Sequence, residues 1–257
     1  MKVYVFGTCA GTEPIPGTHH VSFAVRHNEQ LYWFDAGECC SYTAQMMGVD
    51  VRDINSIFIS HTHMDHIGGL GNLLWNIRKL DMRDNKCDGK TIRLFMPDTK
   101  TGPALKCLLE QTEGGFICRF SIAESRVSDG VLLDECGIKV TALHNSHLPP
   151  FLDGTFRSFS YMIEADGKTL VFTGDTGSYF EIEPFIRRAD VLMAETGHHT
   201  PKQVCEALNK MGCMPEKLLF IHNGRPLLFD RENAVKEAKA VYNGYLQVLN
   251  DRDTFSM

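Results

Sequence analysis

Short segments of apolar or alternating apolar and polar residues recur along the whole chain of 257 residues. Alternation with a period of two is typical of β-strands, and several of these segments are bounded by Gly, Asp or Asn, which favour turns. We predict a strand in each segment with this pattern: 3–7, 22–26, 31–35, 56–60, 92–96, 116–120, 140–143, 158–164, 170–173, 191–194 and 218–221.

Helical spacing of apolar residues appears between these strands. The segments that show it are 66–80, 103–113, 201–211 and about 231–246. The third has a clear beginning and end. Thr200 is a predicted N-cap with Pro201 at the first helical position, Gln203 completes a capping box, and Gly212 stops the helix.

No linker, low-complexity segment or repeat of 20 to 50 residues divides the chain. We therefore expect a single domain over residues 1–257. Strands in meander-like groups, followed by strands interleaved with helices, fit two packed sheets with helices outside.

Composition narrows the class of protein. The hydrophobic content of 43% and charged content of 23% are those of a globular protein. No apolar run approaches the roughly 18 residues that span a bilayer, and the chain opens on the strand-like segment 2–6 rather than on a signal peptide. We expect a cytoplasmic protein without membrane contact.

The net charge and the cysteine spacing argue against a general nucleic-acid-binding protein and against a zinc-ribbon or CxxC site. The formal net charge of −6 argues against broad nucleic-acid binding, which depends on Lys and Arg that neutralise phosphates. The nine cysteines, among them the adjacent Cys39 and Cys40, lack zinc-ribbon or CxxC spacing. In a reducing compartment they are most simply free thiols, and we assign them no role.

The segment His61-Thr62-His63-Met64-Asp65-His66 carries four potential metal ligands directly after a predicted buried strand. His61 and His63 project to the same side of an extended chain and can hold one ion together. Asp65 and His66 lie where helical spacing begins, so the chain turns and directs them away from the first pair. That turn suits a second ion nearby. The alternative is a surface turn that happens to be rich in histidine.

Three further predicted strands end in metal-binding side chains, and strand ends are where such folds gather reactive groups. Segment 140–143 is followed by His144 and His147, of which we favour His147 because His144 is still inside the strand. Asp175 follows segment 170–173, and His222 follows segment 218–221. Alone, Asp175 would be an ordinary turn residue and His222 a core histidine.

These elements resemble the metallo-β-lactamase-fold hydrolases. The resemblance covers Asp35 in Phe34-Asp35-Ala36-Gly37, the 61–66 cluster, His147, Asp175 and His222. It implies an α+β fold, a four-layer αββα sandwich with a dinuclear metal site. Carried over by position, His61, His63 and His147 would hold one metal, Asp65, His66 and His222 the other, and Asp175 would bridge them.

Two looser motifs resemble the ribonuclease Z and phosphodiesterase branch of that family. They are the Gly-rich segment 6–17 and the segment Gly197-His198-His199-Thr200, which precedes a helix and then His222. The chain also departs from the family pattern. Met64 stands where a small Gly is usual, and Arg225 follows His222 one place earlier than expected.

Only 27 residues separate His147 from Asp175. In the ribonuclease Z branch that this chain resembles, a long arm between the corresponding ligands grips the tRNA. The short interval and the negative charge argue against tRNA as the partner. A small anionic molecule is the expected substrate, and the oligomeric state stays open.

Imidazole and carboxylate ligands suit two divalent ions, with Zn²⁺ favoured and Mn²⁺ or Fe²⁺ also compatible. Such ions lower the pKa of a bridging water and generate hydroxide at neutral pH. We therefore expect a phosphodiesterase in which hydroxide attacks a small anionic diester. Asp65 helps orient the hydroxide and His198 stabilises a substrate oxygen, although segment 198–199 could also be a plain solvent-exposed approach to the helix. His199 is the weaker candidate, and Glu195 could orient an imidazole.

Two other functions stay open at this stage. A thioesterase or lactonase resembling the glyoxalase II branch would keep the metals and cleave a different bond. A metal-containing ligand sensor would keep the fold with little turnover. Segments 82–90 and 148–157 are the expected pocket rims.

Overall fold

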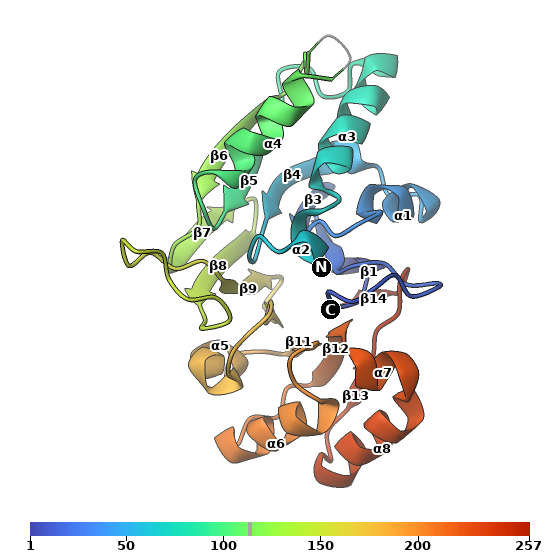
Figure 1. Ribbon diagram of the computed structural model, residues 1–257, viewed down its shortest axis with the longest axis vertical. Helices are drawn as coiled ribbons and strands as arrows, with labels where there is room; N and C mark the ends of the chain where they lie inside the picture. Colours follow the sequence, from blue (N-terminus) through green and yellow to red (C-terminus); the bar gives the residue numbers. More distant parts are fainter. Residues whose placement is uncertain (113–114) are drawn as a thin grey trace.

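Two sheets lie face to face with helices on both outer sides (Figure 1). The computed structural model describes residues 1–112 and 115–257. The first sheet contains, in order across it, β14 (Thr254–Ser256), β1 (Lys2–Gly7), β2 (Ser22–His27), β3 (Gln30–Phe34), β4 (Ile54–Phe58), β5 (Thr91–Met96) and β6 (Ser121–Arg126). The second contains β13 (Leu246–Val248), β12 (Lys217–Asn223), β11 (Val191–Thr196), β10 (Lys168–Phe172), β9 (Phe159–Ala165), β8 (Ile138–His144) and β7 (Gly130–Glu135).

Each sheet is antiparallel at one side and parallel at the other. In the first sheet β3, β4, β5 and β6 pair in parallel, and in the second sheet β10, β11, β12 and β13 do so. Because β8 and β10 both pair antiparallel with β9, β8 runs in the same direction as β10. The carboxyl ends of β8, β10, β11 and β12 therefore meet at one edge of the second sheet.

Helices cover the outer faces and complete the predicted four-layer αββα sandwich. They are α1 (Cys40–Met46), α2 (Met64–Ile67), α3 (Leu70–Asp84), α4 (Thr101–Glu110), α5 (Glu183–Ile186), α6 (Pro201–Met211), α7 (Arg225–Phe229) and α8 (Arg231–Val241), with 3-10 turns η1 (Val51–Asp53) and η2 (Tyr179–Ile182). Buried residues of α1, α3 and α4 pack on the first sheet, and those of α5, α6 and α8 pack on the second. A third buried cluster joins the two sheets.

Aromatic rings fill the space between the sheets. Phe23 of the first sheet stacks on Phe34 at 5.0 Å between ring centroids and meets Phe172 of the second sheet edge-on at 4.9 Å. Tyr161 of the second sheet contacts Phe34 and Phe58 edge-on. Rings in such arrangements bury large apolar areas, which fixes the two sheets against each other.

Most predicted elements are confirmed, with α6 matching residue for residue. Its capping box is present: the Thr200 side chain accepts from the Gln203 backbone, and the Gln203 side chain accepts from the Thr200 backbone. The predicted helix 66–80 is divided at Gly68–Gly69 into α2 and α3. The predicted helix 103–113 is α4, and residue 113 lies outside the described residues.

The strand predicted over 116–120 is wrong. The next strand begins at Ser121, and the apolar side chains of Phe116, Cys118 and Phe120 instead pack into the cluster beneath α3 and α4. β6 itself is mostly exposed because it is an edge strand, so it carries no apolar alternation that would reveal it.

The helix predicted over about 231–246 ends at Val241. Tyr242 is extended and the chain then pairs with β12 as β13. None of the helices in the described residues has the length and apolarity that spanning a bilayer requires.

We predict that Phe23→Ala destabilises the protein by about 3–5 kcal/mol, because it leaves a cavity where rings from both sheets meet. Urea unfolding followed by circular dichroism measures the change. Leu152→Ala is the matched control, since the Leu152 side chain is fully exposed, and its effect should stay within about 0.5 kcal/mol. Equal stability of the two variants would contradict the packing described for Phe23.

Candidate metal centre

The 61–66 cluster follows β4 at the junction of the two sheets. His61 and His66 are fully buried, whereas His63 is exposed and occupies the N-cap position of α2. Asp65 and His66 lie within α2, as the change to helical spacing predicts. The Met64 side chain is 71% exposed, so the larger residue at this position points away from its neighbours.

The remaining histidines and the shared aspartate come from the edge where strands of the second sheet end. His147 lies in the turn after β8, Asp175 follows β10, and His222 lies near the end of β12. Gly174 has φ +55°, and a Cβ at this position would approach the Phe159 carbonyl oxygen at 2.7 Å. A glycine there allows the tight turn from which Asp175 projects inward.

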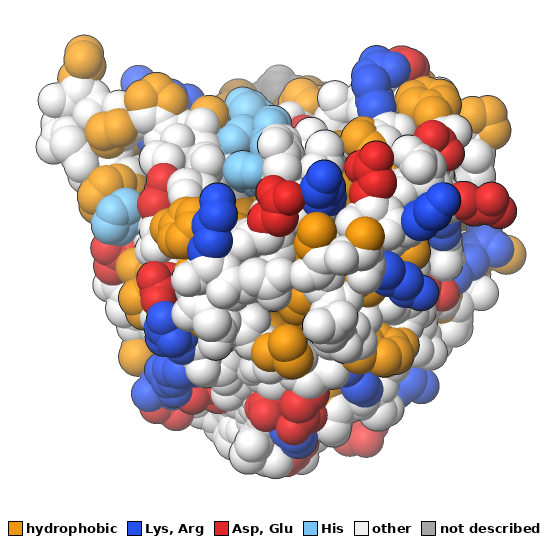
Figure 2. Space-filling model, turned by 90° about the horizontal axis from the view of Figure 1, so that it is seen from below, with side chains coloured by type: hydrophobic (Ala, Val, Ile, Leu, Met, Phe, Trp, Pro, Cys, Tyr) orange, Lys and Arg blue, Asp and Glu red, His pale blue; other side chains and the backbone are white. Residues whose placement is uncertain are grey.

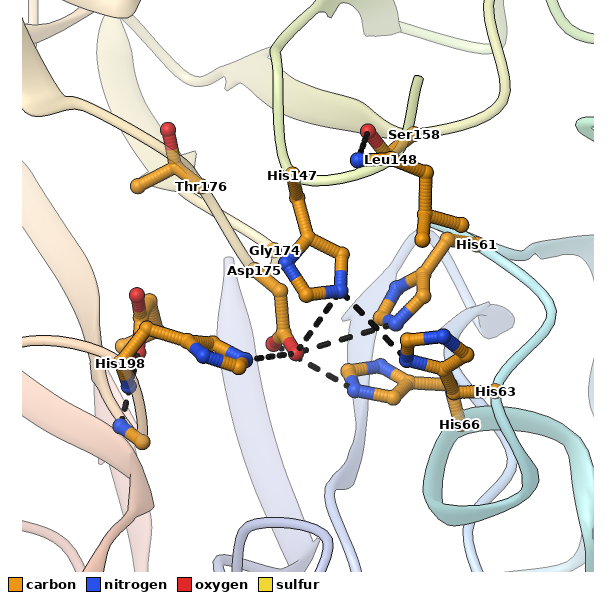
Figure 3. A network of polar contacts seen from close by, with 12 residues as sticks. His61, His63, His66, His147, Leu148, Ser158, Gly174, Asp175, Thr176 and His198 are labelled. Atoms are coloured by element: carbon orange, nitrogen blue, oxygen red, sulfur yellow. Dashed lines mark hydrogen bonds and ion pairs between the residues drawn. The ribbon is translucent and has the colours of Figure 1, made fainter. Parts of the chain in front are cut away.

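Two groups of side chains lie close enough to hold metal ions. Their ligand atoms are within 4.8 Å of one another, and the groups are His61, His63, His147 and Asp175, and Asp65, His66, Asp175 and His222. The histidine rings surround the Asp175 carboxylate in Figure 3. His144, by contrast, pairs with Asp129 and belongs to neither group.

The two carboxylate oxygens of Asp175 face different groups. Oδ2 lies 3.7 Å from Nε2 of both His61 and His147. Oδ1 lies 3.4 Å from Nε2 of His66 and 3.2 Å from Nδ1 of His222. Asp175 is thus the one residue common to both groups, and it presents one oxygen to each.

Several buried polar atoms at this point lack a hydrogen-bond partner within the described chain. They are His61 Nε2, His66 Nε2, Asp175 Oδ1 and His222 Nδ1. A buried polar atom without a partner is costly, and native proteins rarely leave four together. A divalent cation would satisfy such atoms at once, so these residues fit a divalent metal ion.

Burial and neighbouring charges set the protonation of the candidate ligands. Burial lowers the pKa of His61 well below its usual value and that of His147 to about 4, so both rings are neutral and offer lone pairs. Burial alone would raise the pKa values of Asp65 and Asp175, but their histidine neighbours hold both below the usual range.

His66 and His222 behave in the opposite way. Burial disfavours their charged forms, but the Asp175 carboxylate outweighs it, raising the pKa of His66 and bringing that of His222 to about 9. In the metal-free protein these two imidazoles are the counter-ions of the buried carboxylates. A divalent cation held by these residues would supply the positive charge in place of their protons.

Asp35 holds the His66 ring of the second group in place by a hydrogen bond. Its Oδ2 accepts hydrogen bonds from His66 Nδ1 at 2.7 Å and Ser60 Oγ at 2.8 Å, and its Oδ1 accepts from the Ser60 backbone at 2.7 Å. These bonds fix the His66 ring so that its Nε2 points to Asp175 and the other members of the second group. The sequence revealed Asp35 only as part of a motif, and this supporting role depends on contacts across 31 positions.

His198 and His199 diverge although they are adjacent. His198 Nε2 lies 3.0 Å from Asp175 Oδ2, whereas His199 Nε2 lies 3.0 Å from the Thr176 carbonyl oxygen. Glu195 is fully buried, and its Oε2 accepts from the backbone of Gly197 and His198. The same oxygen lies 3.8 Å from His222 Nδ1 and helps to raise the pKa of that ring, so Glu195 contacts both the 197–198 turn and His222.

A pocket of about 370 Å³ opens beside the two groups. Its walls come from three segments, 10–12, 197–198 and 224–226, together with His63, Asp65, Asp175 and His222. Segments 82–90 and 148–157, the predicted rims, do not line this pocket, although 148–157 directly follows His147 of the first group. Histidine side chains reach the surface together on one face (Figure 2).

Comparison with ribonuclease Z sequences gives both full-length and local matches. The ribonuclease Z of Halobacterium salinarum strain R1 is 26% identical over 266 aligned positions, covering 82% of this chain and 84% of that protein. That of Treponema pallidum strain Nichols is 39% identical over 74 residues. This shorter match covers 29% of the chain and only 24% of the relative's length.

Solved structures share the fold at low sequence identity. The metallo-β-lactamase fold protein YhfI of Bacillus subtilis superimposes with a TM-score of 0.75 at 18% identity, covering 99% of this chain and 98% of that one. The short form of human tRNase Z has a TM-score of 0.73 at 17% identity, with 100% and 99% covered. A diphosphatase of the PhnP family has a TM-score of 0.68 at 16% identity, with 100% and 97% covered.

A family model described as the Beta-lactamase superfamily domain matches residues 40–223, which include the 61–66 cluster, His147, Asp175 and His222. With the metallo-β-lactamase sandwich and the two metal-binding groups described above, the chain belongs to the beta-lactamase superfamily of metal-dependent hydrolases.

Proposed function

We propose that this chain is a phosphodiesterase that hydrolyses a small anionic diester, with residues 1–257 acting as one hydrolase domain. The observation that carries the proposal is the Asp175 carboxylate. It faces two metal-binding groups through separate oxygens and contacts His198 at the wall of the adjoining pocket.

In this proposal His61, His63 and His147 hold one divalent ion, Asp65, His66 and His222 hold the other, and Asp175 bridges them. Five imidazoles and two carboxylates form a donor set suited to Zn²⁺, and Mn²⁺ or Fe²⁺ are compatible with the same ligands. When bound, two such ions supply a Lewis acid for the diester and lower the pKa of an attacking water.

The charge of the loaded site favours an anion. Two dications outweigh the two ligating carboxylates, Asp65 and Asp175, so the pocket beside them is positive. The phosphate of a diester carries one negative charge at neutral pH, whereas a thioester or lactone need carry none at the bond that breaks. This difference supports the diester over the thioesterase or lactonase alternative.

Two side chains have positions suited to the proton transfers of diester hydrolysis. Asp65 lines the pocket and can accept a hydrogen bond from the attacking water. His198 lies across the pocket with 47% of its side chain exposed, and its hydrogen bond to Asp175 raises its pKa. A protonated His198 can donate its Nε2 proton to the departing oxygen.

The ribonuclease Z relatives favour a second candidate, a nuclease that acts on tRNA precursors. Two features of the chain argue for a smaller substrate. The interval between His147 and Asp175 holds the loop 148–158, β9 and β10, and a loop of this length is too short for a long protruding arm. The net charge of −6 also opposes binding of a long polyanion.

We predict that zinc-loaded protein hydrolyses bis(p-nitrophenyl) phosphate in preference to a p-nitrophenyl-tagged thioester and a lactone of similar size. Asp175→Ala should abolish the activity, at least about 10³-fold, because both groups lose their shared ligand. Release of chromophore is measured at matched zinc content. Preference for the thioester, or cleavage of a tRNA precursor at a higher kcat/KM, would replace the proposed function.

We predict that Asp35→Asn weakens zinc binding by about 10- to 100-fold, because the amide cannot hold the His66 ring as the carboxylate does. Competition with a chromophoric chelator measures the affinity. Asp129→Asn is the matched control, since Asp129 also bonds a histidine, His144, but lies outside both groups. Equal zinc affinity in the two variants would contradict a role for His66 as a ligand.

We predict that His198→Ala lowers kcat for the diester by about 10²- to 10⁴-fold, the usual contribution of a proton donor, and leaves zinc stoichiometry unchanged. Steady-state kinetics and elemental analysis on the same preparation separate the two effects. His199→Ala should change kcat far less, because His199 bonds the Thr176 carbonyl instead of Asp175. Loss of zinc from His198→Ala would identify His198 as a ligand instead of a proton donor.

A further inference from the structure

An ion pair connects Arg225, which lines the pocket beside the metal-binding groups, to Glu13, the residue that follows the lining segment 10–12. Arg225, the first residue of α7, bonds Glu13 of the N-terminal loop through Nη1–Oε1 at 3.2 Å and Nη2–Oε2 at 2.6 Å. The contact spans 212 positions in the sequence. Arg225 lines the same pocket as Asp65 and His198.

The backbone on both sides of this pair is fixed close to the metal-binding residues. The Ala10 backbone donates to the Asn223 carbonyl at 3.1 Å, and the Asn223 backbone donates to the Thr8 carbonyl at 2.6 Å. Arg225 follows His222 by three residues, and its guanidinium lies 5.8 Å from the centre of the Phe229 ring. The position of the guanidinium at the pocket is therefore set by the same strand that carries His222.

Stability alone gives a weak reason for this pair. The Arg225 and Glu13 side chains are 62% and 52% exposed, and exposed ion pairs contribute little because water screens them. The geometry is nevertheless bidentate, the arrangement in which a guanidinium binds either a carboxylate or a phosphate. An anion with two free oxygens can therefore take the place of the Glu13 carboxylate at small cost.

Arg225 is also the single Lys or Arg among the described residues that line this pocket. The pocket volume of about 370 Å³ is that of a small-molecule site and exceeds the space that one phosphate needs. A diester held at the metal groups leaves room for a further part of the substrate. A second anionic group on the part of the substrate outside the metal groups can form an ion pair with Arg225.

We propose that Arg225 binds a second phosphate of the substrate, and that Glu13 holds the guanidinium in position until this phosphate replaces it. The inference rests on the proposed phosphodiesterase function and specifies its substrate class. The preferred substrate is a diester that carries an additional phosphate, as in a nucleotide diester with a terminal phosphate.

Calorimetric titration of the zinc-loaded protein tests this without turnover. The two probes are thymidine 5′-monophosphate and thymidine 3′,5′-bisphosphate, which differ by one phosphate. We expect the wild type to bind the bisphosphate about 10-fold or more tightly, and Arg225→Gln to reduce this preference to about 2-fold or less at unchanged monophosphate affinity. Arg225→Lys keeps the charge but loses the bidentate geometry, so its preference for the bisphosphate should lie between those of the wild type and Arg225→Gln.

Two further variants sharpen the comparison. Glu13→Gln removes the competing carboxylate and should strengthen bisphosphate binding by about 2- to 10-fold. Arg231→Gln removes the same charge from α8, where Arg231 bonds Asn250 away from the pocket lining, and should leave the preference unchanged. Melting temperature and zinc content verify that each variant is folded and loaded.

Kinetics with the p-nitrophenyl esters of the same two nucleotides separate the two proposals. Arg225→Gln should raise KM for the 3′-phosphorylated ester alone, with kcat unchanged. If neither ester is hydrolysed but the Arg225-dependent preference persists in the titrations, the phosphodiesterase function fails and the anion site stands. A wild type without preference for the bisphosphate, or an Arg225→Gln variant that keeps it, would overturn the inference.

Discussion

The structure depends on one buried carboxylate, that of Asp175, which is almost fully enclosed and faces histidines on both sides. Burial penalises the ionised form of such a group, yet the pKa of Asp175 is held well below its usual value by His222 and His66. A charge of this kind is tolerated only where opposite charge converges on it. The chain supplies that convergence by ending several strands at one place.

This convergence couples the core to the site. The 61–66 cluster belongs to the first sheet, whereas His147, Asp175 and His222 belong to the second, so the two groups exist only when the sheets are packed together. The packing is mediated by rings such as Phe23 and Phe172. Tyr161 adds a direct link, since its hydroxyl donates to the Ile59 carbonyl two residues before His61.

Features determined by neighbouring residues could be predicted from the sequence, and features determined by distant partners could not. The bounds of α6 follow from Thr200, Gln203 and Gly212, all within or beside the helix. The meeting of the candidate ligands around Asp175 follows from dense histidines at strand ends. The strand over 116–120 was wrong because its apolar residues meet α3 and α4 instead of a strand. The pocket walls were missed because segments 10–12 and 224–226 meet only in the folded chain.

The charge distribution bears on the proposed preference for a small anionic substrate. The molecule has a formal net charge of −6, but two dications would make the region around Asp175 positive. Screening confines such a local field to about 8–10 Å at physiological ionic strength. A small diester would lie within that distance, whereas a long nucleic acid would extend beyond it over a protein whose net charge is negative. Under the proposed function, a positive site in a protein of net negative charge would therefore favour a small anion over a long one.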